Sequence, residues 1–244
     1  LKAFWAGERP DVIPFTIYQW EWRHTQHDRA WQGLFGSRSL TGQLPTHYTS
    51  DREADFGPFR AALFRAGIRP ADVHNARRDP STLAAYLELH IEQGQRLDRE
   101  GRDIGIIPRI VGRASYQLAF FGQASHSGTT EIAARRDALL GASTFVVEAH
   151  RLWRDEFGDG IFNTGRLEIS PGVSNVIPNK ASLIMECRHP DEERLAEMES
   201  TLLRLAQELA VAHHLSVSSR RLAHMPVAEL PLHIIEMAEA ACDR

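Results

Sequence analysis

The sequence predicts a mixed α/β protein in which one compact domain is inserted into a larger one. Two observations indicate this. The hydrophobic period alternates between strand-like and helix-like spacing along the chain. Residues 113–225 also show the order strand, helix, strand, strand, helix, strand, which is the split βαβ arrangement of a ferredoxin-like domain. The predicted domains are therefore residues 1–112, the inserted residues 113–225, and residues 226–244, where the chain returns to the larger domain.

The first 112 residues carry the weaker signals. Residues 11–22 are apolar and β-prone, which predicts a strand with Pro14 at its edge or entry. Residues 33–42 hold three glycines and two serines, typical of a tight loop that leads into a short helix. Apolar spacing and stop residues predict helices over residues 55–67 and 80–85, and residues 103–112 are β-prone.

The inserted domain has the clearer pattern. Strands are predicted over residues 115–122, 161–169, 181–188 and 215–222. Two long helices are predicted over residues 131–157 and 191–213, because apolar residues recur there at spacings of three and four. Residues 171–179 form a turn-rich connection, and a single helix is predicted over residues 231–241.

Composition narrows the class of protein. The chain has 244 residues and a net charge of -4, so no basic footprint points to nucleic acid. No apolar run reaches the length of a membrane helix, and the first residues do not resemble a signal peptide. Cys187 and Cys242 lie outside any CxxC pair, which favours a reducing cytoplasm over a disulfide framework or a zinc knuckle. The chain begins without methionine, so we expect a fragment or a trimmed chain.

Residues 86–94, YLELHIEQG, place polar side chains at short spacing inside an apolar run. Such a run fits a buried strand or a helix end. Buried polar groups need partners, since leaving one unpaired costs a few kcal/mol. A neutral His90 then requires a metal or a hydrogen-bond acceptor. The alternative is an ordinary core histidine that is satisfied by its neighbours.

Four stretches, in order, carry a family resemblance: GLFGSRSLTG, LELHIEQG, GQASHSGTTEIAARRD and SNVIPNKASLIMECR. Together they resemble the M20 metallohydrolases of the N-carbamoyl-L-amino-acid hydrolase, allantoate amidohydrolase and β-ureidopropionase group. The resemblance implies an α/β catalytic domain with two divalent ions, zinc or manganese, interrupted by a ferredoxin-like lid domain that forms a homodimer. It also implies hydrolysis of carbamoyl or ureido C–N bonds by a metal-activated water.

The same resemblance implies roles for five residues. His90 corresponds to a metal ligand and Gln93 to a substrate contact. His126 corresponds to a donor to the tetrahedral oxyanion, reaching the site of the neighbouring subunit. Asn175 and Arg188 correspond to the residues that hold the substrate carboxylate, for which the planar Arg fork is suited. Each assignment has a structural alternative. His90 could be a core histidine and His126 an exposed loop histidine. Asn175 could be a turn residue kept for its backbone conformation, and Arg188 a charge at the end of a strand.

The sequence departs from the family where a pair of glutamates is expected, shortly before the GSR-type loop. Thr25 and Gln26 stand there. Threonine is no general base at neutral pH, and a glutamine amide lacks the negative charge that holds two ions together. His24, His27 and Asp28 offer other ligands in a different register, although a solvated loop also explains them.

Further departures concern the ends of the chain. The family's first metal motifs would precede Leu1 and its last would follow Arg244, so His90 is the one implied metal ligand that the sequence contains. Arg113 stands where the family often has Gln. The run Arg135, Arg136, Asp137 is interpreted as structural, a salt-bridged helix start.

Three functions remain open from the sequence. The first is an amidohydrolase of the carbamoylase type. The second is a catalytically dead member that acts as a dimerising or assembly subunit, which Thr25 and Gln26 favour. The third is a hydrolase resembling the M20 dipeptidases, for which Asn175 and Arg188 are less specific markers. The substrate pocket has no readable signature, so N-carbamoyl amino acids, allantoate and β-ureido acids are not distinguished.

Overall fold

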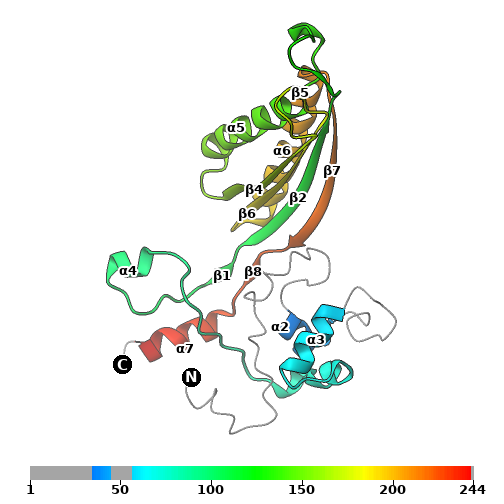
Figure 1. Cartoon of the computed structure of the whole chain (residues 1–244). Coiled ribbons are helices and arrows are strands. Elements are labelled where there is room, and N and C mark those ends of the chain that lie inside the picture. The colour runs from blue at the N-terminus through cyan, green and yellow to red at the C-terminus, as the bar shows by residue number, and fades with distance from the viewer. Residues whose placement is uncertain (1–34, 45–56, 243–244) are drawn as a thin grey trace. The chain divides into compact units, whose positions relative to one another are not determined.

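A computed structural model describes residues 35–44 and 57–242 (Figure 1). The chain forms two compact units, residues 1–90 and residues 91–244. The strand predicted over residues 11–22 and the positions of Thr25 and Gln26 lie outside the described residues. The predicted domain boundaries at residues 113 and 225 stay predictions. Within the described ranges, no helix is both long and apolar enough to span a membrane.

The described residues of the first unit form two α-helices, α2 (Phe35–Thr41) and α3 (Gly57–Arg65), and two 3-10 turns, η3 (Pro70–Ala76) and η4 (Pro80–Thr82). The helices expected near residues 33–42 and 55–67 are confirmed, whereas the one over residues 80–85 shortens to the single turn η4. Leu44, Leu63 and Val73 form a small core, against which Phe35 and Ile68 pack.

The second unit is built on an antiparallel sheet of four strands (Figure 1). Its strands are β2 (Gly112–Phe121), β4 (Ile161–Ser170), β6 (Lys180–His189) and β7 (Ser216–Met225). The spatial order β4-β6-β2-β7 places the two crossover connections as a split βαβ domain requires. The predicted ferredoxin-like order is therefore confirmed, with each strand one or two residues longer than expected.

Two helices cover one face of this sheet (Figure 1). α5 (Ala138–Glu156) contacts β4, β6 and β2, and α6 (Glu192–Ala212) contacts β6, β2 and β7. Alternation along β2 and β6 directs every second side chain into the core between sheet and helices. The largest fully buried side chains of this core are Phe120, Phe145, Phe157, Leu118, Leu183, Met185, Leu195, Met198 and Leu202.

The start of α5 differs from the prediction. Residues 131–137 do not belong to the helix: Ile132–Ala134 form the 3-10 turn η5, and α5 begins at Ala138. The reason is the cap. The Asp137 carboxylate accepts hydrogen bonds from the backbone N–H groups of Leu139 and Leu140, which have no partner within a helix. Asp191 caps α6 in the same way, by accepting from Arg194 N.

One buried polar network ties α6 to the sheet. Glu199, almost fully buried, accepts the Tyr116 hydroxyl, and Arg221 Nε donates to that hydroxyl at 2.8 Å. Arg221 Nη2 also reaches Glu199 at 3.3 Å. Burial raises the pKa of Tyr116, and its hydrogen bond to Glu199 adds to the shift. The network is fully paired, which a carboxylate at this depth requires.

The remaining elements of the second unit precede or follow the sheet domain in the sequence. α4 (Arg96–Glu100) is a single short helix, and α7 (Leu232–Cys242) ends the described chain. β1 (Arg109–Ile110) pairs with β8 (Ala228–Glu229) in a separate antiparallel ladder. This ladder brings together the segments that enter and leave the sheet domain.

Candidate functional site

The first group of predicted site residues lies at one end of the sheet domain, near β5 in Figure 1. The short strand β3 (Ser125–His126) pairs with β5 (Val176–Ile177), with His126 opposite Val176. Ser127 N donates to Asn175 O at 2.9 Å. The structure therefore brings the His126 loop and Asn175 together, and both residues are exposed.

Three chain segments are joined at this end, which we name the loop end: residues 122–130, 131–138 and 171–179. Gly122 N donates to Asn179 O at 2.8 Å, and Gln123 N donates to Arg136 O at 2.9 Å. Ala138 N donates to Pro178 O at 3.0 Å. These bonds satisfy backbone groups that would otherwise require water. They fix the loop end although it contains little regular structure.

Arg135 belongs to this assembly and not to a salt-bridged helix start. Its guanidinium donates to the backbone carbonyls of Ser127 at 2.6 Å and Thr130 at 3.2 Å. This role was not predicted from the sequence. The available signal was the position of an Arg shortly after a glycine- and hydroxyl-rich loop with many carbonyls to satisfy.

Arg188 lies at the other end of the same sheet, which we name the strand end. It occupies the penultimate position of β6, directly opposite Arg113 of β2. The Arg188 Nε and Nη2 atoms both approach Glu186 Oε1 at 2.7 Å, and Arg113 Nη1 lies 3.4 Å from Glu186 Oε2. One carboxylate thus orients two guanidinium groups, and the Arg188 side chain remains 43% exposed.

Asn175 and Arg188, which the family resemblance assigns to one substrate carboxylate, lie at opposite ends of the sheet within a single chain. The chain does reverse after Asn175, but the reversal leads into the first residue of β6, Lys180. Arg188 follows eight residues later along an uninterrupted strand. At about 3.4 Å per residue, the two ends of that run are about 27 Å apart.

The HIEQG stretch also differs from the prediction. Residues 86–94 form no strand or helix turn that buries them; Leu87, for example, is 75% exposed. Glu92 accepts hydrogen bonds from Arg96 N at 2.8 Å and Leu97 N at 3.0 Å, so its carboxylate caps α4. Gln93 adopts a left-handed backbone with φ of 60° before this turn. The stretch therefore joins the two compact units in the sequence and does not contribute to a core.

His90 is the last residue of the first unit, and its side chain is exposed. The described residues contain no group of three or more His, Cys, Asp and Glu side chains that could hold a metal ion. A dinuclear centre therefore does not fit the donors that the structure describes. His24, His27 and Asp28 lie outside the described residues.

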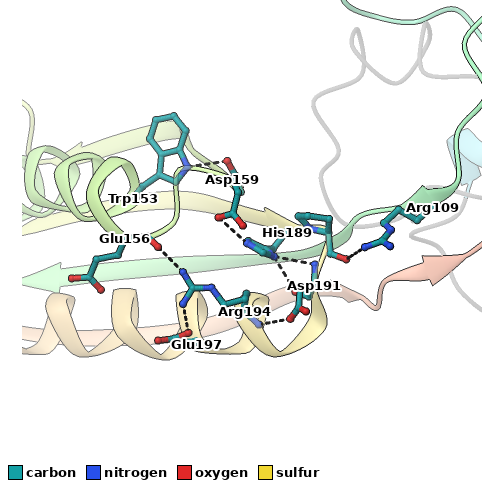
Figure 2. Close-up of polar contacts among 10 residues, drawn as sticks. Arg109, Trp153, Glu156, Asp159, His189, Asp191, Arg194 and Glu197 are labelled. Atoms are coloured by element: carbon teal, nitrogen blue, oxygen red, sulfur yellow. Dashed lines mark hydrogen bonds and ion pairs between the residues drawn. The ribbon is translucent and has the colours of Figure 1, made fainter.

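A polar cluster that the sequence did not predict is centred on His189, the residue that follows Arg188 in β6 (Figure 2). His189 is 2% exposed, and its Nδ1 accepts a hydrogen bond from Asp191 N at 3.0 Å. Its Nε2 lies 3.1 Å from Asp159 Oδ1, within range of the carboxylate but short of good hydrogen-bond geometry. The contact with His189 holds the pKa of Asp159 below its ordinary value.

The neighbours of His189 show that this cluster is structural (Figure 2). Arg194 at the start of α6 donates to Glu156 O at 2.5 Å, at the end of α5. Trp153 Nε1 donates to Gly160 O at 3.0 Å, at the turn before β4. Arg109 Nη1 reaches Pro190 O at 3.3 Å. Together these contacts join both helices to the strand end.

Comparison with known proteins agrees with the fold. The model of the family "Peptidase dimerisation domain" matches residues 110–214. The N-carbamoyl-L-amino acid amidohydrolase of Geobacillus stearothermophilus is 30% identical over 86% of this chain and 51% of its own length. The allantoate amidohydrolase of Bacillus subtilis is 30% identical over 70% of this chain and 41% of its own length.

Solved structures of the hydantoinase/carbamoylase family also resemble the chain. An amidase of the hydantoinase/carbamoylase family from Burkholderia vietnamiensis superposes with a TM-score of 0.74 at 30% identity, covering 89% of this chain and 52% of the amidase. The chain spans about half the length of the curated relatives it matches. The chain belongs to the M20 family, in the group that includes the N-carbamoyl-L-amino-acid and allantoate amidohydrolases.

Proposed function

We propose that this chain is the lid-bearing part of an amidohydrolase that cleaves the carbamoyl or ureido C–N bond of small carboxylate substrates. N-carbamoyl-L-amino acids and allantoate-like ureido acids are the substrate class. The observation that carries the proposal is the separation of two half-sites on one domain. His126 and Asn175 lie at the loop end, and Arg188 lies at the strand end.

A small substrate cannot contact both half-sites of one copy, because about 27 Å of extended strand separates them. A site that uses all three residues therefore takes His126 and Asn175 from one copy and Arg188 from a second. This arrangement agrees with the homodimer that an M20 dimerisation domain suggests.

The edge strand β4 supplies the surface for that second copy. β4 and β7 are the two edges of the sheet. β4 exposes apolar side chains, with Ile161 54% and Leu167 44% exposed. β7 presents Arg220 and Arg221, charges of the kind that discourage edge pairing. The outer side of α5 adds the exposed Leu140 and Val147 beside the β4 edge.

Pairing through β4 also brings the correct half-sites together. Ile161 at the start of β4 is aligned with Arg188, and Ser170 at its end leads into the connection that holds Asn175. An isologous pair of β4 strands runs antiparallel. The start of β4 in one copy then lies beside the end of β4 in the other. The Arg188 end of each copy therefore faces the loop end of its partner.

The chemistry follows from the side chains. The Arg188 fork suits bidentate binding of a carboxylate, and the Asn175 amide adds a neutral donor. His126 donates a hydrogen bond to the oxygen that becomes negative as the C–N bond is attacked, which stabilises the tetrahedral state. Gln93 is proposed as a further substrate contact. Positioning by remote carboxylate binding keeps the carbamoyl group near His126.

Family membership suggests a divalent metal, zinc or manganese, that would activate the attacking water. Among the described residues His90 is the proposed ligand, and those residues do not complete a centre. A catalytically dead assembly subunit is the second candidate, because Thr25 and Gln26 replace the expected glutamates. Raised hydrolysis of an N-carbamoyl substrate with manganese in the Thr25→Glu, Gln26→Glu variant would favour that candidate.

Mixing two variants tests the proposal. Arg188→Ala and Asn175→Ala each remove one half of every site, so neither should bind N-carbamoyl-L-alanine in titration calorimetry. After subunit exchange, half of the dimers are mixed and each of these regains one intact site. Roughly a quarter of the wild-type capacity should return. Arg136→Ala, an exposed neighbour of the loop end, should bind normally.

Two results would contradict the proposal. Normal binding by Arg188→Ala would make Arg188 a strand-end charge with no role in carboxylate recognition. Exchange that is complete by mass spectrometry but restores no binding would remove the two-copy site.

A further inference from the structure

We infer that Arg135 is a positioning residue: it holds the His126 loop so that the neutral ring carries its proton on Nε2 and presents that N–H outward. The use of this N–H toward an oxyanion rests on the proposed function. The tautomer and the clamp rest on contacts within this chain, so they can be tested without turnover.

The tautomer follows from one backbone contact. Gly128 N donates to His126 Nδ1 at 3.1 Å. An N–H donor requires a lone pair on Nδ1, so the proton of the neutral imidazole belongs on Nε2. Because His126 is exposed, Nε2 is available to a ligand. A histidine that must donate to a developing negative oxygen needs this tautomer in advance of binding.

The clamp acts on the residues next to that contact. Arg135 Nη2 donates to Ser127 O at 2.6 Å, and Arg135 Nε donates to Thr130 O at 3.2 Å. These two carbonyls bracket Gly128 in the sequence, so the bonds fix the peptide whose N–H faces the ring. On the other side, pairing of β3 with β5 fixes the backbone of His126 itself. The loop is thus held from both sides.

A side chain at position 128 would crowd the His126 ring. A Cβ at position 128 would lie 3.2 Å from His126 Cε1, tighter than an ordinary contact. The turn η5 returns the chain so that Arg135, which follows it, reaches back over the loop. Arginine suits the task because its planar fork serves two carbonyls at once, whereas a lysine ammonium is a single point donor.

Arg136 is the matched control. It is the adjacent residue and carries the same charge, but its side chain is exposed and its backbone carbonyl, which accepts from Gln123 N, is retained on substitution. A change that appears in Arg135 variants and not in Arg136→Ala therefore reports the two carbonyl contacts and not the net charge of the loop.

The test is the ring-nitrogen spectrum of His126 in the ¹⁵N-histidine-labelled chain, assigned by comparison with His126→Gln. At a pH where the ring is neutral, the wild type should show the Nε2–H pattern. Arg135→Ala should lower the preference for that tautomer by about fivefold, the effect of losing one ordinary hydrogen bond. Arg135→Lys should lie between the two, and Arg136→Ala should match the wild type. Gly128→Ala should shift the spectrum even if Arg135→Ala does not fold.

The outcomes are decisive in both directions. A wild-type ring with its proton on Nδ1, or an even mixture, overturns the tautomer assignment. An unchanged Nε2–H pattern in a folded Arg135→Ala overturns the positioning role. If both spectra behave as expected but the mixed-variant binding fails, the proposed function is wrong and the inference stands.

Discussion

The two ends of the sheet hold their candidate functional groups by different means. At the loop end, His126 and Asn175 are placed by backbone hydrogen bonds among three irregular segments, with Arg135 as the side-chain brace. At the strand end, Arg188 is placed by a regular ladder and by its shared carboxylate Glu186. The first arrangement depends on the exact path of the chain, and the second depends on charge.

This difference predicts where each end is vulnerable. An irregular loop end tolerates a change of side-chain charge but not an added atom near its backbone. A strand end tolerates modest changes of shape, because the ladder continues on both sides, but responds to ionisation. Loss of the contacts at one end should leave those at the other end in place, since different hydrogen bonds hold the two ends.

The largest expected effect is at Gly122. A Cβ there would lie 1.9 Å from Arg136 O, so the backbone of the loop end must move. We expect Gly122→Ala to lower the free energy of unfolding by about 3 kcal/mol, at the upper end of ordinary overpacking. Urea unfolding followed by circular dichroism measures the change.

Two glycines calibrate this result. Gly160 at the strand end would place a Cβ 2.8 Å from Arg188 O, a milder clash, so Gly160→Ala should cost less than Gly122→Ala. Gly165 in β4 meets only Asn163 Nδ2 at 3.4 Å, and Gly165→Ala should change stability by less than about 1 kcal/mol. Equal losses at Gly122 and Gly160 would remove the contrast between the two ends.

A smaller effect is expected where the two ends of different copies are proposed to meet. Leu167→Lys puts a charge on the exposed β4 edge, which should weaken dimerisation at least about tenfold, or about 1.4 kcal/mol. Sedimentation velocity over a concentration series measures this. Ser219→Lys, at an exposed position of the β7 edge, is the control and should dimerise normally. A reversed pattern would assign the interface to β7.

The sheet domain was predictable because its signals are long and periodic. The helix face of α6 and the alternation in β2 and β6 depend on burial, which the sequence records directly. The predicted start of α5 was wrong because Asp137 caps the helix and is a stronger boundary signal than the residues before it. The predicted burial of residues 86–94 was wrong because an apolar composition does not guarantee burial in a segment that connects two units of the chain.

The candidate site was predictable residue by residue but not in its arrangement. The motif containing His126 identified the loop. The clamp, however, depends on a contact of Arg135 with Ser127, eight residues earlier, and a 3-10 turn lies between the two residues. Asn175 and Arg188 are near in sequence, and only the strand register reveals that they lie at opposite ends. The roles of His90, Gln93, His126, Asn175 and Arg188 stay predictions until binding is measured.

The smallest effect is a pH dependence of the strand end. Contact with His189 lowers the pKa of Asp159 from its ordinary value of 3.8. A carboxyl whose pKa is lower in the folded state stabilises the fold above its ordinary pKa, and this contribution is lost as the pH falls through the folded value. The wild type should therefore lose stability between about pH 5 and pH 3 more steeply than Asp159→Asn, which cannot titrate there.

Urea unfolding midpoints at successive pH values measure the two slopes. Asp155→Asn, an exposed residue on α5, is the control and should follow the wild type. Because Asp159 is well exposed, the difference should be small and should shrink further in high salt. Parallel curves for wild type and Asp159→Asn would mean that His189 is held by its contact with Asp191 alone, and the strand end would then be no more sensitive to acid than the loop end.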